Sequence, residues 1–91
     1  MSRCLKITVR ATGWQSHWHD KIADSAKRLQ IEGVLQTVGA DLIKIIACGT
    51  EDHLDDFLDD LYELFADSAS YVEEMEPFVK DRDYRGIFRV L

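Results

Sequence analysis

The chain has 91 residues, of which 46% are hydrophobic and 10% aromatic, as is typical of one globular domain rather than a disordered segment. Its formal net charge of −6, with Lys and Arg scattered along the sequence, argues against nucleic acid and anionic membranes as partners. Because no apolar run approaches the ~20 residues that cross a bilayer and no secretory leader opens the sequence, we expect a cytoplasmic protein without membrane contact.

The first third of the chain predicts a strand, a loop and a helix. Apolar residues alternate with polar ones at Leu5, Ile7, Val9 and Ala11, which indicates a half-buried strand. Residues 12–16 break this pattern, and the Ser16 hydroxyl is suited to cap the helix that follows. The apolar face of that helix recurs at helical spacing, on Trp18, Ile22, Ala26 and Leu29.

The rest of the chain predicts a hairpin, a second helix and two further strands. Residues 31–38 and 42–48 have strand character and are separated by a tight turn at 39–41. Thr50 can cap a second helix, whose apolar stripe extends to Phe65 and whose other face is acidic. After a polar break at Asp67 and Ser68, strands are predicted over residues 70–79 and 86–91.

This order of elements predicts a single α+β domain that spans residues 1–91. Two amphipathic helices with a hairpin between them bury their apolar faces when both pack on one face of an antiparallel sheet. We therefore expect a ferredoxin-like two-layer sandwich, βαββαβ, with a fifth closing strand.

The two cysteines, Cys4 and Cys48, are too few for the disulfide framework of a small secreted domain. We expect both to be reduced thiols within strands, in agreement with the cytoplasmic location predicted above.

The strand over residues 42–48 is apolar on both faces. Ile43, Ile45 and Ala47 occupy one face, and Leu42, Ile46 and Cys48 occupy the other. Because helices cover only one face of a two-layer fold, the second row is either partly exposed or part of an interface. One hypothesis is a homodimer through the open sheet face, and the other is ordinary scattered surface apolarity.

Three stretches of the sequence resemble the acylphosphatase family, and the likeness extends from about Cys4 to Leu91. They are AKRLQIEGVLQT at 26–37, the strand ending in Ala47-Cys48-Gly49, and YRGIFRV at 84–90. The resemblance implies a loop before the first helix whose backbone amides cradle a phosphate. It also implies an arginine that clamps the phosphate at the end of this loop, and an asparagine in the second strand that orients the attacking water.

Other residues occupy these reactive positions. In an ungapped register His19 stands at the arginine position and Thr37 at the asparagine position. A neutral imidazole offers one donor where a guanidinium offers a planar fork, and a hydroxyl is shorter than an amide. We therefore expect a binding or assembly module without efficient acyl-phosphate hydrolysis, acting on an unidentified protein partner and without a cofactor. The candidate anion-binding loop consists of Gly13, Trp14, Gln15, Ser16, His17, Trp18 and His19.

Two alternatives stay open. In a weak or altered acylphosphatase, His19 would bind the phosphoryl group, Thr37 would position water, and free amides at the helix start would stabilise the anion. A less favoured alternative is metal binding through His17 and His19. On a helix these two side chains point to different sides, and no third ligand stands at a recognised spacing, so we predict no metal.

Overall fold

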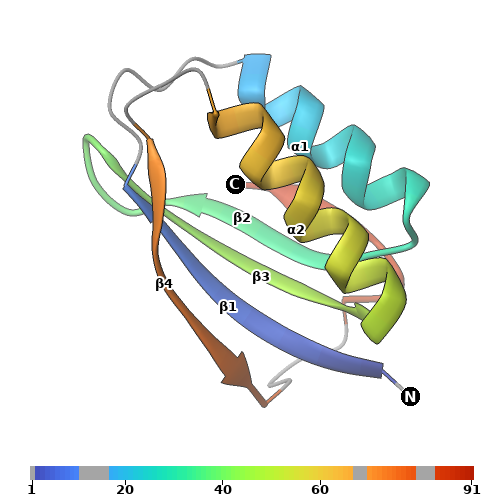
Figure 1. Ribbon diagram of the computed structural model, residues 1–91. Helices are drawn as coiled ribbons and strands as arrows, with labels where there is room; N and C mark the ends of the chain where they lie inside the picture. Colours follow the sequence, from blue (N-terminus) through green and yellow to red (C-terminus); the bar gives the residue numbers. More distant parts are fainter. Residues whose placement is uncertain (1, 11–16, 67–69, 80–83) are drawn as a thin grey trace.

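Figure 1 shows a computed structural model of the chain, which describes residues 2–10, 17–66, 70–79 and 84–91. The helices and strands that we predicted are present within these residues, with ends that differ by a few positions. In chain order they are β1 (Ser2–Arg10), α1 (His17–Arg28), β2 (Glu32–Thr37), β3 (Leu42–Thr50), α2 (Glu51–Phe65), β4 (Tyr71–Phe78) and β5 (Phe88–Val90).

The sheet has five strands in the order β4-β1-β3-β2-β5. Strand β1 is antiparallel to both β3 and β4, and β2 is antiparallel to β3. The prediction of a wholly antiparallel sheet is wrong at β5, which pairs parallel to β2. The reason is topological. Strands β4 and β5 form opposite edges of the sheet, and β4 ends at the end of the sheet where β2 begins. The chain then crosses to the far edge, and β5 runs beside β2 in the same direction.

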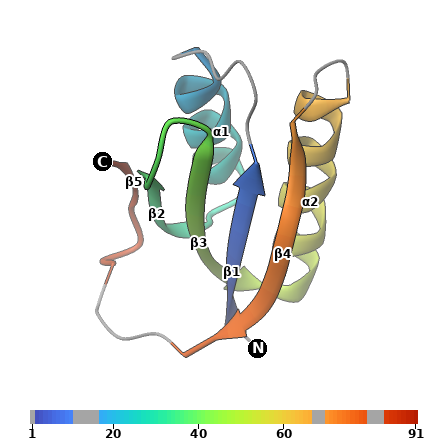
Figure 2. The same ribbon diagram turned by 90° about the vertical axis from the view of Figure 1, so that its left-hand side faces the viewer.

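Both helices lie on the same face of the sheet and leave the other face open (Figures 1 and 2). The side chains that fill the space between the two layers are almost wholly buried. This was predicted by the alternation of apolar residues in the strands and by their helical spacing in the helices. They include Ile7 and Val9 of β1, Ile43 and Ile45 of β3, Ile22 and Ala26 of α1, and Leu54, Phe57 and Leu61 of α2. The predicted two-layer α+β architecture is therefore confirmed.

Gly33 in β2 is needed for the close approach of β2 and β3. Its φ angle is +148°, and a Cβ atom built on it would lie 1.8 Å from the carbonyl oxygen of Ile46. A side chain at this position would therefore both strain the backbone and collide with β3.

The prediction that both cysteines are reduced thiols is wrong. Cys4 of β1 and Cys48 of β3 are direct partners in the antiparallel ladder, and the structure joins them in a disulfide. Alternation within each strand places cysteine in a strand but does not specify which residue it faces. That pairing depends on the register between two strands whose cysteines lie 44 residues apart in the sequence.

The second apolar row of β3 is largely buried within the chain itself. Ile46 and Cys48 are each 3% exposed, and Leu42 is half-buried. Ile46 lies between Lys6 of β1 and Val34 of β2 in the two ladders. The homodimer through the open sheet face therefore stays a prediction, and the middle of β3 presents no exposed apolar row to support it.

Candidate functional site

Two of the site residues implied by the resemblance, His19 and Thr37, lie at one end of the sheet, here called the loop end. Strands β1 and β2 both finish there, because each is antiparallel to β3, which begins there. Arg10 pairs with Leu42, and Thr37 pairs with Ile43. Helix α1 also begins at this end, as Figure 2 shows. The topology therefore brings position 37 and the start of α1 to the same edge of the molecule.

The two replacement residues occupy different settings at the loop end. His19 is the third residue of α1 and is half-buried, whereas Thr37 is the last residue of β2 and is exposed. The first turn of a helix has backbone amides without helical partners, which favour anions. Of the other predicted loop residues, Gly13, Trp14, Gln15 and Ser16 lie outside the described residues, as does the side chain of His17.

Trp18 belongs to the core of the protein. It is 8% exposed, and its ring packs edge-on against Phe65 of α2 with a centroid distance of 5.5 Å. Edge-to-face aromatic pairs at this separation are favourable beyond the area that they bury. Trp18 thus holds the start of α1 against the end of α2, and its ring is directed into the protein.

Arg10 brings a guanidinium to the loop end, but two carboxylates hold it. Its Nη2 atom donates to both carboxylate oxygens of Glu73, at 3.1 and 3.3 Å, and Nη1 lies 3.4 Å from Asp41. The hydrogen bond to Glu73 raises the pKa of the Arg10 side chain, and the negative charge of Glu73 adds to the effect. The guanidinium of Arg10 is therefore engaged by two carboxylates at the loop end.

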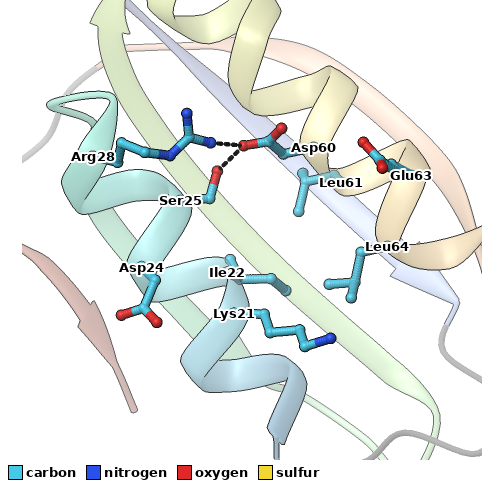
Figure 3. Close-up of a pocket in the computed structure, with 9 residues that line it drawn as sticks. All are labelled: Lys21, Ile22, Asp24, Ser25, Arg28, Asp60, Leu61, Glu63 and Leu64. Carbon is cyan, nitrogen blue, oxygen red and sulfur yellow. Dashed lines mark hydrogen bonds and ion pairs between the residues drawn. The ribbon is translucent and has the colours of Figure 1, made fainter.

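A cavity of about 620 Å³ lies between the two helices (Figure 3). Asp60 of α2 accepts hydrogen bonds there from Ser25 and from Arg28 of α1, both at 2.5 Å. Ile22, Leu61 and Leu64 form its apolar part. We did not foresee this bridge, because the sequence shows only that Ser25 and Arg28 share one face of α1 by their i,i+3 spacing.

Metal-ligating groups do not gather in the described part of the chain: no three His, Cys, Asp or Glu side chains there lie close enough to hold an ion. Among the same residues, no helix is both long and apolar enough to cross a membrane.

Neither a protein-family model nor a curated protein matches the chain. Solved structures do match it. An acylphosphatase from Coxiella burnetii is 22% identical, with a TM-score of 0.77, and the match covers 99% of this chain and 93% of that one. The match to T. kodakarensis HypF has a TM-score of 0.80 at 16% identity, and covers all of this chain but 12% of HypF.

The same fold also occurs in proteins that are not described as acylphosphatases. Klebsiella pneumoniae BlrP1, solved with FMN and cyclic diGMP, is 17% identical with a TM-score of 0.66, over all of this chain and 26% of BlrP1. Identities this low speak for the fold alone, because one fold carries many activities. The resemblance that the sequence predicted is confirmed at this level: over its whole length, the chain has the fold of the acylphosphatases.

Proposed function

We propose that this chain is a ferredoxin-like, acylphosphatase-type module that acts by binding or assembly and does not hydrolyse acyl phosphates efficiently. One observation carries the proposal. The scaffold is retained over the whole chain, while the loop end presents His19 and Thr37 where the resemblance implies an arginine and an asparagine.

The chemistry of these residues supports low activity. An imidazole lacks the planar fork of donors that a guanidinium presents, so His19 supplies a weaker and less directional interaction with a phosphoryl group. Removing a single preorganised donor typically costs roughly 10²–10³ in rate, and two such groups differ here. Arg10 does not compensate, because Glu73 and Asp41 already bind its guanidinium.

A weak acylphosphatase is the second candidate, favoured by the position of His19. It lies in the first turn of α1, where helix amides favour an anion, and Thr37 is exposed to solvent at the same end of the sheet. In this version His19 binds the phosphoryl group and Thr37 orients the water. Metal binding through His17 and His19 is a third and weaker proposal, since two imidazoles leave at least one ligand to be supplied.

Hydrolysis of an aryl acyl phosphate such as benzoyl phosphate tests the first two proposals. We expect the purified chain to add little to the background rate between pH 5 and about 8, the range over which imidazole changes charge. Turnover at about 10 s⁻¹, the median of ordinary enzymes, would contradict the binding-module proposal if His19→Ala abolished it and His53→Ala, a matched change in the first turn of α2, did not.

A restoration experiment separates the two replaced residues from the loop. We expect the double variant His19→Arg/Thr37→Asn to recover little activity, because Trp14, Gln15 and Ser16 carry Cβ atoms that disfavour the positive φ angles of phosphate-cradling loops. Strong recovery would show that the two side chains alone account for the lost chemistry. A zinc titration of the native chain beside His17→Ala/His19→Ala tests the metal proposal, and equal uptake by both would reject it.

A further inference from the structure

The Cys4–Cys48 pair lies at the opposite end of the sheet, which we call the disulfide end. We propose that this disulfide is a redox-active site that exchanges reversibly with small thiols while the domain stays folded. The proposal does not depend on the function proposed above. Disulfides are rare in a reducing cytosol and are usually transient or redox-sensing where they occur there, so a redox role also fits the location expected from the sequence.

The β1–β3 ladder does not depend on the disulfide. The two strands pair over nine residues each, and paired residues lie on both sides of the cysteines, at Arg3↔Gly49 and Leu5↔Ala47. Once the sulfur–sulfur bond is broken, the ladder still holds the two thiols opposite each other, with Cα atoms 4.0 Å apart in the oxidised protein. Reoxidation is then intramolecular between groups that are already oriented, which favours a reversible couple.

The two cysteine residues differ in their exposure to solvent. Cys4 is half-buried, whereas Cys48 is 3% exposed. Cys48 nevertheless lines a cavity of about 260 Å³, which also contains Glu32, Gly49, Thr50 and His53. An external thiol therefore reaches Cys4 more readily than Cys48.

These positions define a direction for the exchange. A thiolate attacks Sγ of Cys4, a bond forms between the two sulfurs, and the Cys4–Cys48 bond breaks with its electron pair on Sγ of Cys48. A second thiolate then attacks the external sulfur of the mixed disulfide and releases Cys4 as a thiolate. The net change is two external thiols oxidised to one disulfide, with two cysteine thiols formed after proton uptake.

The test equilibrates the whole native chain in glutathione buffers of graded reduced-to-oxidised ratio, followed by acid quenching and alkylation. We expect one reversible transition, from no alkyl group to two per chain, reached from either direction. Near-UV circular dichroism should stay that of a folded protein throughout. Reduction that needs denaturant, or that abolishes the near-UV signal, would overturn the proposal, as would a reduced chain that oxidised glutathione cannot reoxidise.

Single-cysteine variants test the direction of attack. Cys48→Ser leaves Cys4 alone, and Cys4→Ser leaves Cys48 alone, so their rates of adduct formation with oxidised glutathione compare the two positions. We expect the adduct on Cys4 to form faster, because that residue is the more exposed of the two. Equal rates, or faster reaction at Cys48, would reject attack on Cys4. The variant Cys4→Ser/Cys48→Ser should show no adduct and retain the folded spectrum.

Discussion

The two ends of the sheet carry different chemistry, although the same strands build both. At the loop end stand His19 and Thr37, where the resemblance implies an arginine and an asparagine, and the Arg10 guanidinium is bound by Glu73 and Asp41. At the disulfide end, Cys4 and Cys48 face each other across the ladder beside a cavity. The resemblance to acylphosphatases suggests a site at the loop end, whereas the contacts within this chain suggest one at the disulfide end.

The comparison of the two ends indicates that the apolar core and the reactive residues at the ends of the sheet are separate features of this chain. The core between the layers runs through both ends, from the Trp18–Phe65 contact at the loop end to Ala47 beside the disulfide. Since that core consists of apolar side chains from both helices and the sheet, we expect that polar and sulfur-containing residues at either end can change without altering the fold. Substitutions placed at each end can therefore show which features support the domain and which support its chemistry.

The largest effect is expected for Gly33→Ala, at the disulfide end of β2. The new Cβ would lie 1.8 Å from the Ile46 carbonyl oxygen at a φ of +148°, so steric overlap and backbone strain act together. We expect a loss of more than about 4 kcal/mol in the free energy of unfolding, or failure to fold. Urea denaturation followed by far-UV circular dichroism measures it.

Gly39→Ala is the matched control at the loop end. A Cβ at Gly39 would lie 3.7 Å from the nearest atom of Leu42, an ordinary contact, so we expect little change in stability. If Gly33→Ala were as stable as Gly39→Ala, the close approach of β2 to β3 at the disulfide end would be wrong.

Removal of the disulfide is expected to have the next largest effect. In the chain-entropy account, a cross-link between residues 44 apart stabilises by roughly 4 kcal/mol, because it restricts the unfolded chain. Cys4→Ser/Cys48→Ser should therefore unfold at lower urea concentration than the oxidised protein, yet remain folded in buffer. The reduced wild type should match the variant, and reductant should not affect the variant itself.

Most of the fold could be predicted because it follows from local periodicity. Alternation at Leu5, Ile7 and Val9 predicts β1. The N-cap Thr50 and the apolar stripe that follows it predict α2, and the Thr50 hydroxyl accepts a hydrogen bond from the His53 amide, as expected of an N-cap. Each of these signals lies within one element and needs no knowledge of its neighbours.

The features that could not be predicted depend on pairing between distant segments. The final strand was foreseen, but its residues do not specify which edge of the sheet it joins, so its parallel pairing with β2 was missed. The disulfide was missed because it requires the β1–β3 register as well as two cysteines. For the candidate site, the sequence gives the identities of His19 and Thr37, and topology then places both at the loop end.

The smallest expected change in the free energy of unfolding is that of Trp18→Phe at the loop end. This variant tests the role of Trp18, which belongs to the predicted anion-binding loop. If its ring serves packing, Trp18→Phe should lower the free energy of unfolding by roughly 1–2 kcal/mol, because a smaller ring leaves space against Phe65. Any affinity of the chain for inorganic phosphate, measured by NMR titration, should be unchanged. Tyr62→Phe, at a position of α2 that is 49% exposed, is the control and should alter neither quantity. If Trp18→Phe kept full stability but changed the affinity for phosphate, Trp18 would belong to a ligand-binding site at the loop end.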